Sequence, residues 1–183
     1  MFARGASGPG PEPWRRDGRS GSRSLAGVIR PATIDDIPDI LRLVRALADY
    51  ERALHEVKAT EEQLRERLFG DEPKVFAHVV EHDGRVVGFA LWYLTFSTWN
   101  GTHGIYLEDL FVEPDVRGKG YGKLLLTELA RSAGERGYER VEWSVLNWNT
   151  PAIEFYAAMG ARPQDEWTVY RLTGDALTEA ARR

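Results

Sequence analysis

Hydrophobic and polar residues follow two rhythms along this chain, one typical of helices and the other typical of strands. Apolar residues three and four positions apart predict a last short helix near the carboxyl end and longer helices over 33–52, 60–68, 118–136 and 149–159. Shorter apolar runs predict strands at 28–31, 75–81, 85–95, 104–112, 140–146 and 167–172.

Glycine and small polar residues mark where these elements begin and end. Thr33 and Asp36 have the spacing of a helix-capping pair, and Gly137 is placed to end a helix. Asp83-Gly84 is typical of a type I′ hairpin turn, and Asn100-Gly101 predicts another turn between strands.

The first 27 residues are mostly glycine, serine, proline and arginine. Such a segment buries too little apolar surface to offset the entropy of ordering it. We therefore expect residues 1–27 to be a disordered extension and residues 28–183 to be a single domain. A targeting peptide is the alternative interpretation, although glycine and proline interrupt any amphipathic helix and no apolar signal core is present.

Composition narrows the class of protein. The 183 residues include no cysteine, which removes disulfides, thiolate metal sites and a cysteine nucleophile. No apolar run reaches the ~18 residues that span a bilayer, so we expect no membrane segment and a cytoplasmic protein. The net charge is −4 and residues 1–27 carry +3, so the remainder carries −7. An acidic domain favours cationic ligands over nucleic acid.

The four histidines do not form a metal motif. A metal site needs several ligands at characteristic spacings, and these histidines lack them. We therefore expect no bound metal, and surface or hairpin positions for His55, His78, His82 and His103.

A run of alternating glycines, 117–122, follows the strand predicted at 104–112 and opens the next helix. Glycines let backbone N–H groups approach a ligand, and the helix adds its positive N-terminal end, so the natural ligand is a phosphate. A dinucleotide fingerprint needs a glycine where Lys123 stands, and a Walker loop needs other residues at Arg117 and Leu124. By itself such a run is also typical of a flexible turn.

Placed after a strand that reads Glu-Asp-Leu-Phe-Val, the motif resembles that of the GNAT N-acetyltransferase superfamily, particularly its diamine and polyamine (spermidine/spermine-type) enzymes. The resemblance runs from about residue 29 to 172 and comprises 48–51, 106–109, 117–122, and 149–156 followed by Gly160-Ala161. It implies an α/β fold with a mixed, mostly antiparallel twisted sheet and helices on both faces.

In that family acetyl-CoA straddles a split in the sheet, and the resemblance implies which residues would hold it. The backbone of Leu110, Phe111 and Val112 would meet the acetyl and pantetheine portion. Asn149 would reach the pantetheine arm, and it is equally suited to cap a helix. The pyrophosphate would lie on Arg117, Gly118, Lys119, Gly120, Tyr121, Gly122 and Lys123.

The catalytic roles also follow from the resemblance. Without cysteine an acetyl-cysteine intermediate is impossible, so direct attack of an amine on the thioester is the simplest mechanism. An amine with a pKa near ~10.4 must lose a proton, and the departing thiolate must gain one. Glu108, alone or through a water molecule, is the expected base and ammonium anchor. Tyr156 falls at the family's acid position, although beside Phe155 it is also typical of a core aromatic residue.

The positions that hold the acceptor in the relatives are acidic and aromatic, a combination that binds ammonium groups. In this chain they are Tyr50, Glu51, Glu108 and Glu142, with Trp143 in the same stretch. Isolated surface glutamates are otherwise usually only solvated. The polyamine enzymes carry one more acidic residue before the last strand, where this chain has Thr168, with Glu166 two residues away. The identity of the acceptor is therefore open.

We expect an acetyl-CoA-dependent N-acetyltransferase that acts on a small diamine, polyamine or lysine-like amine and pairs as a homodimer, as the relatives do. Two alternatives remain: acetylation of lysine or N-terminal amines in proteins, and a non-catalytic acetyl-CoA-binding module. The presence of both Glu108 and Tyr156 favours catalysis.

Overall fold

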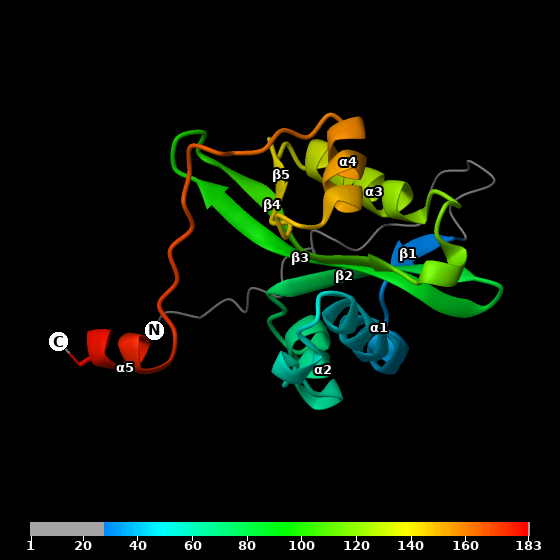
Figure 1. The fold of residues 1–183 in the computed structure, drawn as a ribbon, viewed down its shortest axis with the longest axis horizontal. Helices are drawn as coiled ribbons and strands as arrows, with labels where there is room; N and C mark the ends of the chain where they lie inside the picture. Colours follow the sequence, from blue (N-terminus) through cyan, green and yellow to red (C-terminus); the bar gives the residue numbers. More distant parts are fainter. Residues whose placement is uncertain (1–27, 183) are drawn as a thin grey trace, which may run out of the picture. The chain divides into compact units, whose positions relative to one another are not determined.

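Five strands form one sheet in the order β1-β2-β3-β4-β5, which is also their order in the chain (Figure 1). Neighbouring strands are antiparallel from β1 to β4, whereas β5 runs parallel to β4. The strands are β1 (Ile29–Pro31), β2 (Val75–His82), β3 (Arg85–Ser97), β4 (Thr102–Val112) and β5 (Val141–Trp143).

The computed structural model describes residues 28–182 of the chain. The extension predicted for residues 1–27 lies outside these. The chain divides into two compact units, the first ending at Ser144 and the second comprising Val145–Arg183. The sheet belongs to the first unit. The expectation of a single domain over 28–183 stays a prediction.

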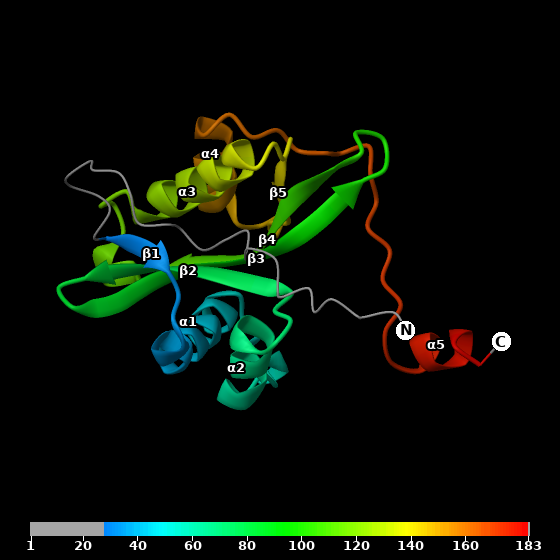
Figure 2. The ribbon, with the colours of Figure 1, turned by 180° about the vertical axis from the view of Figure 1, so that it is seen from behind.

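Helices cover both faces of the sheet. Helices α1 (Ile37–Tyr50) and α2 (Glu61–Phe69) lie on one face, and α3 (Tyr121–Glu135) lies on the other (Figures 1 and 2). The main core lies between the sheet and the α1–α2 layer, where Ile40, Leu43 and Phe89 are fully buried. The predicted α/β fold, with a mixed and mostly antiparallel sheet, is confirmed.

The turn predicted at Asp83-Gly84 joins β2 to β3. Asp83 has a φ of 50° and Gly84 a φ of 74°, and a type I′ turn needs positive φ at both central residues. This hairpin and the next place β4, which carries the predicted catalytic segment, between β3 and the edge strand β5.

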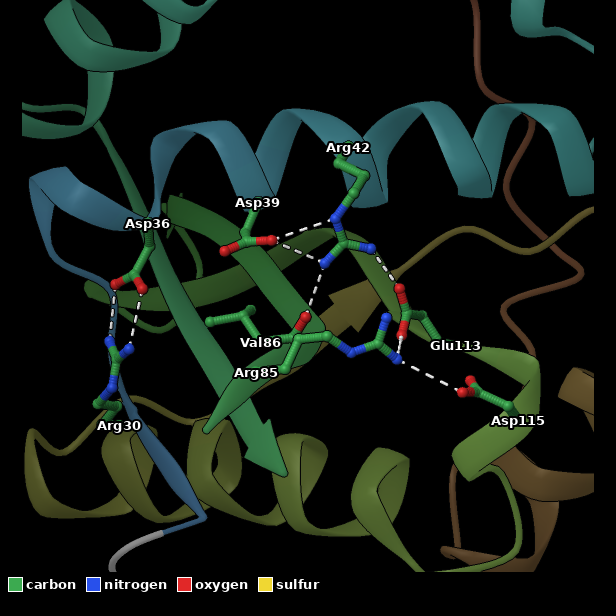
Figure 3. Close-up of polar contacts among 8 residues, drawn as sticks. All are labelled: Arg30, Asp36, Asp39, Arg42, Arg85, Val86, Glu113 and Asp115. Carbon is green, nitrogen blue, oxygen red and sulfur yellow. Dashed lines mark hydrogen bonds and ion pairs between the residues drawn. The ribbon is translucent and has the colours of Figure 1, made fainter. Parts of the chain in front are cut away.

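A bidentate ion pair ties β1 to the start of α1. Arg30 donates from Nη1 to Oδ2 of Asp36 at 2.7 Å and from Nη2 to Oδ1 at 2.9 Å (Figure 3). The backbone N–H of Thr33 donates to the same carboxylate at 2.6 Å, which confirms the predicted capping pair. Burial opposes ionisation, but these donors hold the pKa of Asp36 below its ordinary value.

A second ion-pair cluster fixes the residue at which the chain leaves β4 (Figure 3). Glu113 is buried and accepts from Arg42 of α1 and from Arg85 of β3, the latter at 2.6 Å. Arg42 also donates to the carbonyl oxygen of Val86 at 2.7 Å and to Asp39 at 2.8 Å. The backbone is therefore anchored to a helix and a strand just before the glycine run.

Of the two positions predicted for His78, the hairpin holds and the surface does not, because the residue is buried within the β2–β3 pair. This residue lies in the middle of β2, is 7% exposed, and its Nδ1 accepts a hydrogen bond from Nε1 of Trp92 at 3.2 Å. The apolar residues around it in β2 carry the strand into the core, and the indole N–H satisfies the buried ring nitrogen. Within residues 28–182 no three side chains are grouped as metal ligands, and the expectation of no metal stays a prediction.

The strand predicted at 167–172 is also wrong. The second unit contains α4 (Thr150–Ala158) and α5 (Gly174–Ala180), and residues 161–173 between them form no strand. A strand exists only where its backbone pairs with a neighbour, and a side-chain pattern does not supply one. The apolar side chains of that segment are exposed: Trp167, Val169, Tyr170 and Leu172. Glu166 and Thr168 therefore do not lie on one face of a strand.

None of the helices within residues 28–182 has the length and apolar content that crossing a bilayer requires.

Candidate active site

A β-bulge in the middle of β4 sets Glu108 apart from its neighbours. On β3, Leu91 lies opposite Asp109. The next residue, Trp92, lies opposite Leu107, so Glu108 is an additional residue in this ladder. A bulge bends the strand and re-aims the side chain that it adds. Glu108 is exposed there, whereas Asp109 is partly buried on the α1 face, which it shares with the core residue Leu91.

Three carboxyl groups interact at this bulge, and we call Glu51, Glu108 and Asp109 the acidic cluster. Burial raises the pKa of Asp109 to about 6, and the negative charges of Glu108 and Glu51 add to the rise. Glu51 directly follows α1, and burial raises its pKa as well. The structure thus brings together two predicted acceptor residues and adds Asp109. A bound cation relieves the repulsion among such carboxylates.

Two tyrosines border the acidic cluster. Tyr93 of β3 and Tyr106 of β4 lie opposite each other, and their ring centroids are 5.2 Å apart. Burial, the charges of Glu108 and Tyr106, and a hydrogen bond with Glu108 raise the pKa of Tyr93. Aromatic faces beside carboxylates are suited to alkylammonium groups.

Glu142 already has a cationic partner within the chain. It lies on β5 opposite Tyr106, and its Oε2 is 2.8 Å from Nε of Arg140. Trp143 follows it and is partly buried. The predicted role of Glu142 in holding the acceptor therefore competes with an ion pair that the sequence analysis did not foresee.

The glycine run has the backbone that a phosphate site requires. Gly118 and Gly120 have φ values of 79° and 83°, in the left-handed region that favours glycine. Gly120 is the N-cap of α3, so the first N–H groups of a 15-residue helix open onto this loop. Lys119 and Lys123 are exposed beside it. Amide donors, a positive helix end and two cations fit a pyrophosphate.

The side chain of Tyr121 lies away from this loop. Its hydroxyl is 2.8 Å from Nδ1 of His82 on β2. Only the backbone of Tyr121, together with that of Gly122, is then available to the predicted phosphate site.

Among the strands that the structure describes, the end of β4 pairs with β3 alone. The pairing of β4 with β5 ends at Leu107, before the bulge. Leu110 is partly buried, and Phe111 and Val112 are buried as they continue along β3. Since the side chains of residues 110–112 are buried or partly buried, the backbone of this segment is the part that can contact an extended ligand.

The first residue of the glycine run makes unexpected contacts. Nε of Arg117 donates to the carbonyl oxygen of Val112 at 3.0 Å. The guanidinium carbon lies 5.2 Å from the ring centroid of Tyr50 and 5.6 Å from that of Phe111. The structure thus brings a predicted phosphate ligand next to a predicted acceptor residue.

Asn149 and Tyr156 belong to the second unit. Asn149 is the N-cap of α4, and its Oδ1 accepts from the backbone N–H of Ala152 at 3.4 Å. Tyr156 is partly buried on α4, with its ring centroid 5.3 Å from that of Phe155. The capping role of Asn149 is confirmed. The roles of both residues toward acetyl-CoA stay predictions.

Sequence reasoning overlooked Asp109 and Tyr93 as members of the site. A signal for Asp109 existed, because adjacent Glu and Asp in a strand that is otherwise apolar break the alternation and mark a bulge. No signal pointed to Tyr93, since its place beside Glu108 depends on the register of β3 against β4.

Comparison with known proteins agrees with this architecture. Residues 40–161 match the acetyltransferase (GNAT) family. A thialysine N-epsilon-acetyltransferase from Bos taurus is 38% identical over 165 residues, covering 84% of this chain and 96% of that protein. An L-ornithine N5-acetyltransferase from Arabidopsis thaliana is 35% identical over 194 residues, covering 81% of this chain and 85% of that protein.

A solved structure shares the fold. An integron cassette protein from the mobile metagenome of V. cholerae has a TM-score of 0.73 and 27% identity, covering 86% of this chain and 99% of that chain. The family match includes the bulged strand, the glycine run and α4. The chain is thus an acyltransferase enzyme and belongs to the GNAT acetyltransferase family.

Proposed function

We propose that this enzyme moves acetyl from acetyl-CoA to the primary amine of a small acceptor with a second charged group, a diamine or a lysine-like amino acid. The acidic cluster carries the proposal, because three interacting carboxyl groups at the β4 bulge form a site for ammonium groups. Tyr93 and Tyr106 add aromatic faces to it.

The names of the relatives support this class of acceptor. Thialysine and ornithine each pair a side-chain amine with a charged amino-acid end. A lysine-like acceptor would place its reacting amine at Glu108, and Glu51 would hold a second cationic group. Glu142 would contribute only where its ion pair with Arg140 opens.

In the proposed reaction the amine nitrogen bonds to the thioester carbonyl carbon, and the carbon–sulfur bond breaks. Glu108 accepts a proton from the ammonium group, directly or through a water molecule, and the free amine then attacks. Asp109, with its raised pKa, retains a proton more readily than an ordinary aspartate, and Glu108 is the exposed carboxyl group beside it. Tyr156 gives its hydroxyl proton to the departing thiolate.

Acetyl-CoA would lie along the end of β4 and over the glycine run. The backbone of residues 110–112 would face its acetyl and pantetheine portion, and Asn149 would reach the pantetheine arm. The amide groups of residues 118–123 would hold the pyrophosphate, and the positive φ of Gly118 and Gly120 supports this placement. The side chains of Lys119, Lys123 and Arg117 add positive charge.

We also propose a homodimer. Four large apolar side chains in residues 161–173 are exposed, and Tyr170 is 92% exposed. A second copy of the chain would cover such residues and offer a neighbouring backbone to pair with. Light scattering of the purified chain tests this. The cytoplasmic location stays a prediction.

Thiol release from acetyl-CoA with a panel of acceptors tests the proposed function. The panel contains 1,4-diaminobutane, spermidine, L-ornithine, L-lysine, butylamine and a lysine-containing peptide. We expect kcat/KM to be highest for the small acceptors with two charged groups. Equal or better turnover of the peptide would instead favour protein acetylation.

A further inference from the structure

Arg117 lies between two parts of the molecule that the proposed reaction gives to different substrates. Phe111 and Val112 end β4, the strand proposed to meet acetyl-CoA, and Arg117 contacts both. Tyr50 ends α1, and Arg117 covers its ring as well. The side chain of Arg117 therefore contacts both the end of β4 and the end of α1.

The contact with Tyr50 bears directly on the acidic cluster. Tyr50 directly precedes Glu51 in the chain, and the negative charge of Glu51 helps to raise the pKa of Asp109. The ring of Tyr50 borders solvent, and the guanidinium covers one of its faces. An acceptor ammonium group that contacts Tyr50 must then use the other face. The position of Arg117 thus limits where the second charge of the acceptor can lie.

We propose that Arg117 is a positioning residue that holds Tyr50 and Glu51 against the end of β4 and so shapes the acceptor site, in addition to any contact with phosphate. This inference rests on the proposed function, in which Tyr50 and Glu51 bind the acceptor.

Arginine is suited to this role and lysine is not. The planar guanidinium lies against aromatic rings while its Nε–H donates in the same plane, whereas an ammonium group is a compact point charge. Arg117→Lys keeps the positive charge for a phosphate and loses the hydrogen bond to Val112 and the planar contact with Tyr50. The substitution therefore separates the two roles of Arg117.

Steady-state kinetics with L-ornithine and 1,4-diaminobutane test the inference. In Arg117→Lys the acceptor KM should rise about 3- to 30-fold, the range expected for one lost cation–π contact. The acetyl-CoA KM should change less than about 3-fold, and kcat at saturation should be retained. Lys119→Gln, which removes an exposed cation of the same loop, should leave the acceptor KM within about 3-fold of the wild type.

A double-mutant cycle with Tyr50→Leu then shows whether Arg117 acts through the ring. In the Tyr50→Leu background, Arg117→Lys should add less than about 2-fold to the acceptor KM, because contacting residues are not additive. Thermal unfolding of each variant verifies the fold.

Two results would overturn the inference alone: an acceptor KM unchanged in Arg117→Lys while the wild type is active, or additive effects in the cycle. A wild type that acetylates neither amine overturns the proposed function and this inference with it.

Discussion

Glu108 and Asp109 are adjacent at the β4 bulge, where Glu108 is exposed and Asp109 is partly buried. Burial raises the pKa of Asp109 to about 6, and the negative charge of Glu108 adds to the rise. Neighbouring carboxyl groups do not both ionise freely. The partly buried Asp109 therefore keeps its proton to a higher pH than an ordinary aspartate. Glu108 is exposed at the same bulge, which suits it to meet an ammonium group and take its proton.

The raised pKa of Asp109 predicts a pH-dependent stability. In the unfolded chain Asp109 loses its proton near 3.8, and in the fold near 6. Between these values the folded state binds more protons, so the free energy of unfolding falls as the pH rises. Asp109→Asn should therefore raise the Tm at pH 7, by about 2–4 °C for each kcal/mol recovered, and leave it unchanged at pH 3.5. Differential scanning calorimetry measures both. Asp71→Asn, at an exposed position, is the control substitution. An equal Tm gain at both pH values in Asp109→Asn would contradict the explanation.

The glycine run should bind phosphate mainly through its backbone. Gly120 has a φ of 83°, so Gly120→Val strains the loop and blocks approach to its N–H groups. Lys119→Ala removes only an exposed charge. We expect Gly120→Val to weaken acetyl-CoA binding more, as measured by isothermal titration calorimetry. Equal losses would assign the affinity to side-chain charge.

Tyr156 should act through its hydroxyl group. If it protonates the thiolate, Tyr156→Phe should lower kcat about 10²- to 10⁴-fold, the usual size of a general-acid contribution. The affinity for acetyl-CoA should barely change, because one hydroxyl is removed. Phe155→Leu, on the same helix, serves as a packing control. A normal kcat in Tyr156→Phe would leave Tyr156 with a packing role only.

Glu51 and Glu108 should differ in their effect on acceptors of different charge. Glu51→Gln should penalise 1,4-diaminobutane, about 10-fold or more in kcat/KM for a lost charge-assisted contact, and leave butylamine nearly unaffected. Glu108→Gln should impair both amines, because it acts at the reacting nitrogen. Added salt should raise the KM of the diamine more than that of butylamine. Butylamine as good as the diamine in the wild type would exclude a second cation site.

Glu113 and Asp115 form a matched pair for stability. The side chain of Glu113 is 12% exposed and pairs with two arginines, whereas that of Asp115 is 67% exposed and pairs with Arg85 at 3.4 Å. Glu113→Gln should lower the free energy of unfolding by about 1–3 kcal/mol, because it removes the anion that Arg42 and Arg85 share. Asp115→Asn should cost less than about 1 kcal/mol. Urea denaturation of the two variants makes the comparison.

The parts of the fold that depend on local chemistry were predictable from sequence. Asp83-Gly84 forms the expected turn because the turn type requires positive φ at both residues. Asn149 caps α4 as its position implied. The prediction of a strand at 167–172 was wrong because strand pairing is not local. The burial of His78 within its hairpin could not be predicted, because it depends on the indole N–H of Trp92 on the next strand.

The candidate site shows the same division. The glycine run was recognisable because positive φ values at Gly118 and Gly120 favour glycine, and glycine is visible in the sequence. The contact between Arg117 and Tyr50 joins residues 67 positions apart in the chain, and the pair of Arg140 with Glu142 uses a side chain that no motif marked. The first contact depends on how α1 packs beside the end of β4, which the sequence does not show.

The bulge makes Glu108 dispensable to the sheet that carries it. Leu107 and Asp109 already alternate between the faces that Trp92 and Leu91 occupy, so a chain lacking residue 108 would pair β3 with β4 without interruption. Every residue after the deletion would keep its side of the sheet and its partner. The strand is therefore one residue longer than its hydrogen-bond ladder requires, and a deletion variant should fold at least as well as the native enzyme while losing its turnover.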